Sequence, residues 1–113
     1  MAEEPANEEG GSIEGAAVFP LIPAELGVHP LLLAMLHAYV FLEGSDPNVL
    51  HPDAAEEALE YLATYLQRLS GPDLKRVEED FRALAGLAKT EKWPKQQIRF
   101  LAEFLKDNGV GGS

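Results

Sequence analysis

Four prolines constrain the fold of this chain more than any other feature, because each precedes a segment with a helical pattern. Proline fits the first turn of an α-helix, where its missing N–H is not needed, but it breaks a helix interior. Each proline therefore marks the expected start of a helix and not a position within one. The four prolines are Pro30, Pro52, Pro72 and Pro94.

After three of these prolines, large apolar residues recur three and four residues apart, which is the spacing of one helix face. The first segment is apolar at nearly every position from Leu31 to Leu42, so we expect it to be the central helix, with no side facing water. No stretch alternates with the period of two that is typical of a strand. The expected helices span residues 30–43, 52–70, 72–89 and 94–108.

Four helices joined by short turns predict antiparallel neighbours, so the expected fold class is all-α. The predicted architecture is a compact four-helix bundle or an orthogonal helical array, formed as one domain by residues 29–109. Residues 16–28 are largely apolar, but Pro20 and Pro23 forbid a regular helix there. We therefore expect an extended N-terminal arm that packs on the helical body.

The charges are distributed unevenly along the chain. The net charge is −10, and no Lys or Arg precedes Arg68, whereas 12 acidic residues do. From Arg68 onward there are nine basic and seven acidic residues. An acidic chain repels nucleic acid at long range, but the C-terminal half can still present a local basic face. Residues 1–15 are expected to be a disordered acidic tail and residues 110–113 a flexible one.

Several classes of protein are excluded or disfavoured by what the chain lacks. It contains no cysteine, which excludes disulfides, thiolate metal sites and cysteine nucleophiles. The N-terminus is acidic and lacks the apolar stretch of a secretory signal. The longest apolar run, from Leu31 to Leu42, is too short for a membrane span, which needs about 20 residues. We therefore expect a cytoplasmic protein.

The most chemically varied stretch is FLEGSDPNVLHPD, from Phe41 to Asp53. Read as a calcium loop that starts at Asp46, it lacks an oxygen ligand at the fifth position and glycine at the sixth. Its residues are better explained as a left-handed helix stop at Gly44, a turn at Asp46 and Pro47, and the start of the next helix. The remaining prediction is an acidic rim formed by Glu43, Asp46, His51 and Asp53.

No constellation typical of a cofactor site or of catalysis is present. His29 and His37 lie more than two helical turns apart, so they do not converge on one metal ion, and His37 is expected to be a core residue. The serines fall in expected tails and turns, and neither a nucleophile elbow nor a glycine-rich phosphate loop occurs. Glu56, Glu57 and Glu60 lie on an expected solvated face. We therefore expect neither a cofactor nor an enzymatic activity.

The segment EKWPKQQIRF, residues 91–100, contains the most promising contact site. Helix N-termini carry a partial positive charge and usually attract acidic residues, but here lysines surround the helix start. A positive helix end beside the single tryptophan suits a carboxylate or phosphate ligand, although Trp93 can equally pack back on the core. The candidate contact residues for a partner or an anion are Lys92, Trp93, Lys95 and Arg99.

These features favour a protein-interaction module, such as an adaptor, an inhibitor of the immunity-protein type or an accessory subunit. The expected partner is another protein, or a second copy that exchanges the arm 16–28. One alternative is a helix-turn-helix formed by the third and fourth helices, in which Lys95, Gln96, Gln97 and Arg99 contact nucleic acid. Another alternative is a small enzyme or metal protein that uses the loop 43–53.

Overall fold

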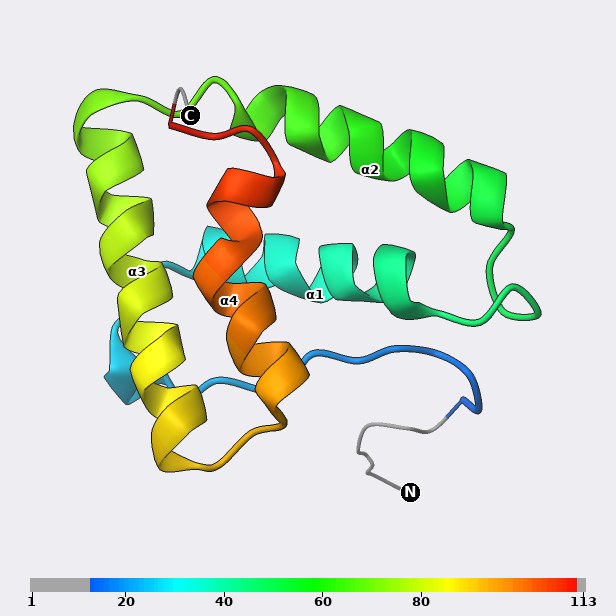
Figure 1. The fold of residues 1–113 in the computed structure, drawn as a ribbon, viewed down its shortest axis with the longest axis horizontal. Helices are drawn as coiled ribbons and strands as arrows, with labels where there is room; N and C mark the ends of the chain where they lie inside the picture. The colour runs from blue at the N-terminus through cyan, green and yellow to red at the C-terminus, as the bar shows by residue number, and fades with distance from the viewer. Residues whose placement is uncertain (1–12, 112–113) are drawn as a thin grey trace. The chain divides into compact units, whose positions relative to one another are not determined.

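The computed structural model describes residues 13–111, and within this range the chain is helical and contains no strand. The all-α prediction is therefore confirmed. Among residues 13–111, one short 3-10 turn, η1, precedes four α-helices (Figure 1). Their bounds are η1 (Ala24–Leu26), α1 (Pro30–Gly44), α2 (Pro52–Leu66), α3 (Gly71–Thr90) and α4 (Lys95–Asp107).

The expected tails fall largely outside the described residues, since residues 1–12 and 112–113 are not described. Val110, which we assigned to the C-terminal tail, is 3% exposed. The N–H of Val110 donates to the Leu105 carbonyl at 2.9 Å, and Gly109 has a φ of 72°. The end of α4 is thus closed by a Schellman motif, whose apolar residue packs inward. None of the helices in the described part has the length and apolar character needed to cross a membrane.

The helix boundaries agree with the sequence to within one residue, apart from the end of α2. The prediction that this helix continues to Ser70 is wrong, because α2 ends at Leu66. The N–H groups of Arg68 and Leu69 donate to the carbonyls of Tyr65 and Leu66, three residues earlier, so the chain tightens into a turn. Ser70 is extended, with a φ of −158°, and it occupies the N-cap position of α3 without a side-chain hydrogen bond.

The structure divides residues 13–111 into two compact units, and the division passes through α1, α2 and the predicted arm. The first unit comprises residues 13–22 and 33–62, and the second comprises residues 23–32 and 63–111. The first contains seven acidic residues and no Lys or Arg, a formal charge of −7. The second contains nine basic and eight acidic residues, a formal charge of +1.

In the first unit, the beginning of the arm packs on α1 and on the loop that follows it. The buried Phe19 ring meets the His37 ring edge to face, with centroids 5.4 Å apart. His37, which we expected in the core, is only half-buried. The Ala17 N–H donates to Ser45 Oγ at 3.0 Å. The Asp46 N–H donates to the Gly15 carbonyl at 2.8 Å. These bonds hold the arm to its own chain.

Gly44 has a different role from the left-handed stop that we expected. It is the last residue of α1, and it is not among the residues with positive φ. A Cβ added at Gly44 would lie 2.9 Å from the Ala17 Cβ, so glycine is needed there for close approach of the arm.

Replacing Gly44 by alanine is therefore expected to lower the free energy of unfolding by about 1 kcal/mol, because crowding outweighs the better helix propensity of alanine. Urea denaturation of Gly44→Ala and of the double variant Ala17→Gly/Gly44→Ala measures this effect. The second substitution removes the crowding atom and should recover most of the loss. Equal stability of the wild type and Gly44→Ala would contradict the close-approach explanation.

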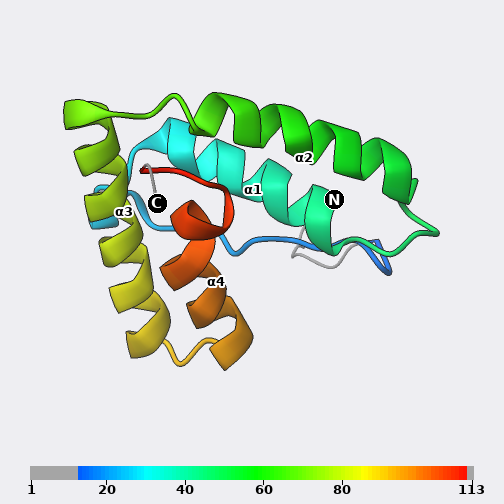
Figure 2. The same ribbon diagram turned by 45° about the horizontal axis from the view of Figure 1, so that its top comes forward.

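In the second unit, α3 and α4 lie side by side and run in opposite directions (Figures 1 and 2). Their facing sides bury Phe81, Leu84 and Ala88 from α3, and Leu101 and Phe104 from α4. The Phe81 and Phe104 rings stack with centroids 5.1 Å apart. This helical hairpin carries the features that bear on function.

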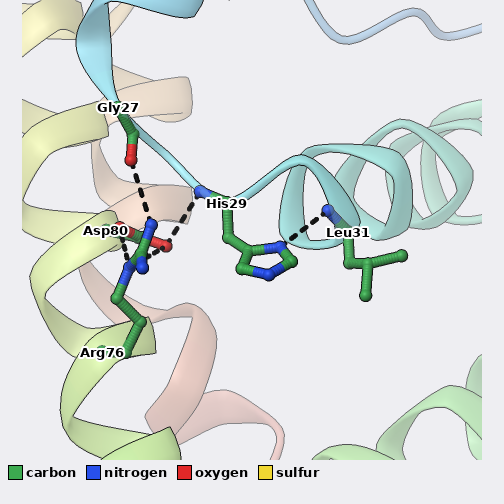
Figure 3. Close-up of polar contacts among 5 residues, drawn as sticks. All are labelled: Gly27, His29, Leu31, Arg76 and Asp80. Carbon is green, nitrogen blue, oxygen red and sulfur yellow. Dashed lines mark hydrogen bonds and ion pairs between the residues drawn. The ribbon is translucent and has the colours of Figure 1, made fainter.

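The second half of the arm is fixed to α3 by one carboxylate (Figure 3). Asp80 is only 5% exposed, and its Oδ2 accepts the His29 N–H at 3.1 Å. The Arg76 Nε donates to Asp80 Oδ1 at 3.1 Å, and Arg76 Nη2 donates to the Gly27 carbonyl at 3.1 Å. Asp80 and Arg76 together therefore position the segment that leads into α1.

Candidate functional site

The turn between α3 and α4 carries two of the four candidate contact residues. The Lys92 N–H donates to the Lys89 carbonyl at 3.2 Å, and the Trp93 N–H donates to the Ala88 carbonyl at 2.9 Å. This pattern is a Schellman motif, with Lys92 at the left-handed position, where its φ is 58°. Lysine at a position that favours glycine keeps a cation in the turn at some cost in backbone energy.

Trp93 is half-buried, and its Nε1–H donates to the Glu91 Oε1 at 3.2 Å. The carboxylate of Glu91 is thus held beside the indole. Lys92, by contrast, is exposed. The turn therefore places the exposed Lys92 next to a partly covered aromatic ring.

The start of α4 is positively charged and lacks a cap. Pro94 occupies the N-cap position without a side-chain hydrogen bond, and the first turn contains no acidic residue. Lys95 and Arg99 are one helical turn apart, and both are exposed. Exposed Lys106 lies on the same side of the helix, because it follows Arg99 by seven residues. Lys95, Arg99 and Lys106 form a basic row along α4.

A hollow of about 410 Å³ lies between α3 and α4. Its apolar lining consists of Phe81 and Ala85 from α3 and Leu101, Ala102 and Leu105 from α4. Two of these residues are alanines, whose small side chains leave space between the helices. Glu78 and Arg82 contribute the polar part of the lining. We call this feature the α3–α4 groove.

Basic residues follow both sides of the groove. On α3, Lys75, Arg82 and Lys89 are seven residues apart, so they share one side of the helix, and Arg82 lines the groove. On α4, Ala102 also lines the groove. The basic row lies on its side of the helix, because Arg99, Lys106 and Lys95 are three, four and seven residues away from it. We call Lys75, Arg82, Lys89, Lys95, Arg99 and Lys106 the basic rims.

All six residues of the basic rims are exposed. Within residues 13–111, none of them makes an ion pair. The cations of the other two arginines have neighbours: Arg76 pairs with Asp80, and Arg68 lies over the Tyr65 ring at 4.7 Å. Among residues 13–111, the rims therefore hold cations without ion-pair partners beside a largely apolar surface.

The groove was not predicted from the sequence, although part of its pattern was visible there. The predicted residues Lys95 and Arg99 belong to its basic rims, whereas Lys75, Arg82, Lys89 and Lys106 were missed. The heptad spacing of the three cations on α3 was the available signal. The apolar lining had no such signal, because Phe81 and Leu101 also read as ordinary core residues.

The antiparallel arrangement of α3 and α4 bears on the nucleic-acid alternative. In a helix-turn-helix, the second helix crosses the first at about 90–120°. Here the two helices form a side-by-side hairpin (Figure 2). Gln96 and Gln97 are exposed at the start of α4. The hairpin geometry does not favour insertion of α4 alone into a major groove.

Two side chains of the predicted acidic rim, Asp46 and His51, accept local hydrogen bonds. Asp46 Oδ1 accepts the Asn48 N–H at 2.9 Å, in the turn that leads away from α1. His51 Nδ1 accepts the Asp53 N–H at 3.1 Å and so caps the start of α2. Glu43 lines a small hollow of about 160 Å³, whereas Asp46, His51 and Asp53 do not.

His29 repeats the role of His51 at the other histidine–proline pair, since its Nδ1 accepts the Leu31 N–H at 3.1 Å (Figure 3). Both histidines thus serve as helix caps, and the repeated motif reflects local chemistry. In the part of the chain that the structure describes, no group of three His, Asp or Glu side chains could hold a metal ion.

No protein-family model, no curated protein and no solved structure matches this chain. The functional argument therefore rests on the groove and on its rims.

Proposed function

We propose that this protein is an interaction module that binds an acidic helical surface of a protein partner, either another protein or a second copy, in the α3–α4 groove. The observation that carries this proposal is the set of six exposed cations, unpaired among the described residues, on both sides of an apolar hollow. We propose no catalytic role, and the cytoplasm remains the compartment that we expect.

The chemistry of the groove favours a helix over an extended peptide or a nucleic acid. An amphipathic helix fills a groove between two helices with apolar side chains at intervals of three and four residues. Acidic residues that flank such a stripe would meet the basic rims on both sides, which speeds association and fixes orientation. Phosphates would use the rims but leave the apolar lining exposed, and the net charge of −10 repels nucleic acid.

Removing two rim cations is expected to weaken partner binding about tenfold, since each exposed ion pair contributes up to about 1 kcal/mol. The test is affinity capture from native cell extract with the wild type and with Lys95→Gln/Arg99→Gln, followed by quantitative mass spectrometry. The control, Gln96→Glu/Gln97→Glu, makes the same change in net charge on the same helix but leaves the rims intact.

A partner that is lost only with Lys95→Gln/Arg99→Gln supports the proposal. Equal loss with the control variant would show that only net charge matters, and it would contradict recognition by the rims. Tight binding of duplex DNA that also depends on Lys95 and Arg99 would instead favour the helix-turn-helix alternative.

A further inference from the structure

Helix α2 displays a large aromatic surface that its own fold leaves exposed. Tyr61 is 62% exposed, and Tyr65, one turn later, is 63% exposed. Glu57 is exposed one turn before Tyr61, so the two side chains leave the helix on the same side. We call Glu57 and Tyr61 the tyrosine edge. Exposed tyrosines are common among the residues that dominate binding energy in protein interfaces.

The tyrosine edge belongs to the acidic unit of the chain. Residues 13–22 and 33–62 carry seven acidic side chains and no Lys or Arg. A surface that approaches these residues therefore meets carboxylates and no Lys or Arg side chain. A complementary surface must offer cations and an apolar area for the tyrosine ring.

The α3–α4 groove offers this combination. Its lining is apolar, and the basic rims are unpaired among the described residues. Ala85 and Ala102 leave room for a side chain to enter between the helices. The chain thus presents an acidic helical surface with a protruding aromatic ring and also a basic groove of matching chemistry.

We infer that the groove of one copy binds the tyrosine edge of α2 from a second copy. The inference rests on the proposed function of the groove and names its partner. Tyr61 enters the apolar lining, while Glu57 lies toward the basic rims. Because the two surfaces differ, the contact is head-to-tail, and a pair of copies keeps one free groove on one copy and one free edge on the other. Assembly therefore continues with rising concentration unless a ring closes.

Sedimentation velocity over a range of concentrations measures this assembly directly. The full chain is expected to show a mean mass that rises beyond that of a dimer. Two variants each remove one surface: Glu57→Gln/Tyr61→Ala removes the edge, and Lys95→Gln/Arg99→Gln weakens the groove. Each variant alone should shift assembly to at least tenfold higher concentration.

The decisive experiment mixes the two variants. The intact groove of the first should accept the intact edge of the second, so an equimolar mixture is expected to form a discrete 1:1 dimer. A matched control, Leu21→Ala/Glu25→Gln, also removes an exposed apolar side chain and an exposed carboxylate, but it leaves α2 unchanged and should assemble like the wild type.

A chain that remains monomeric at every concentration would overturn this inference, as would assembly that both variants leave intact. A mixture that stays monomeric would also overturn it. In each case the proposed function still stands if a different protein is captured from extract with the same dependence on Lys95 and Arg99. If neither self-assembly nor capture of a different protein depends on Lys95 and Arg99, the groove is not a binding site.

Discussion

Replacing Phe104 by alanine is expected to lower the free energy of unfolding by about 3–5 kcal/mol. Phe104 is 2% exposed, and its ring stacks on Phe81 and meets Phe100 edge to face, with centroids 5.1 Å and 5.4 Å away. Truncation removes a large apolar surface and leaves a cavity that the two helices cannot fill by small movements. Small domains are stable by only about 5–15 kcal/mol, so the loss is a large share of the total.

The measurement is urea denaturation followed by fluorescence of Trp93, the only tryptophan of the chain, which lies in the same unit as Phe104. The matched control is Phe41→Ala, which removes the same side chain from a position that is 38% exposed. We expect the control to cost about 1 kcal/mol. Similar losses for the two variants would contradict the assignment of Phe104 to the core of the α3–α4 hairpin.

The second large effect is expected at Asp80. Replacement by alanine should lower the free energy of unfolding by about 2–3 kcal/mol, because hydrogen bonds to a charged group are lost and their donors remain. The donors are the His29 N–H and the Arg76 guanidinium. Without the carboxylate, Arg76 keeps, among the described residues, its bond to the Gly27 carbonyl, whereas the segment that enters α1 loses the bond from the His29 N–H to α3.

Two further variants separate the role of Asp80 from a general effect of charge. Asp80→Asn keeps one acceptor oxygen and is expected to cost about half as much as Asp80→Ala. Glu79→Ala removes the neighbouring carboxylate, which is exposed, and should change stability by no more than about 0.5 kcal/mol. Equal losses for Asp80→Ala and Glu79→Ala would show that burial of Asp80 contributes nothing.

The sequence predicted helices well where the signal was local. Pro30 and Pro52 mark helix starts because the missing N–H and the restricted φ act within one residue. The spacing of apolar residues identified the inner sides of α3 and α4 for the same reason. The end of α2 was predicted wrongly, because the continuing apolar pattern at Leu69 gives no sign of the turn that precedes α3.

Other features depend on parts of the chain that are far apart in sequence. Asp80 lies among charged residues of α3 and gives no local sign that it is buried. Its burial and its bond to His29, 51 residues away, distinguish it from exposed Glu79. Gly44 similarly depends on Ala17, which approaches from the arm. Such long-range pairings leave no periodic pattern in the sequence.

At the candidate site, too, local features were predicted and long-range ones were not. The positive start of α4 was predicted from Lys95 and Arg99, since helix dipole and side-chain charge are local properties. The groove required α3 and α4 to pack as a hairpin, with Ala85 and Ala102 both on its lining. Only then do the cations of two helices become the two rims of one apolar surface.

Site-specific photo-crosslinking from Ala102 tests the central claim most directly, because this small side chain is exposed and lines the groove. The full chain, with benzoylphenylalanine at position 102, is irradiated in its native cells, and crosslinked peptides are identified by mass spectrometry. The control places the same residue at Gln96, outside the groove lining.

We predict a crosslink from position 102 to an acidic helical segment, which is residues 52–66 of a second copy if the chain assembles head-to-tail. Introducing Lys95→Gln/Arg99→Gln should reduce its yield about tenfold. Crosslinks that are equally frequent from positions 102 and 96, or none from position 102 above background, would contradict the claim that the α3–α4 groove is a protein-binding site.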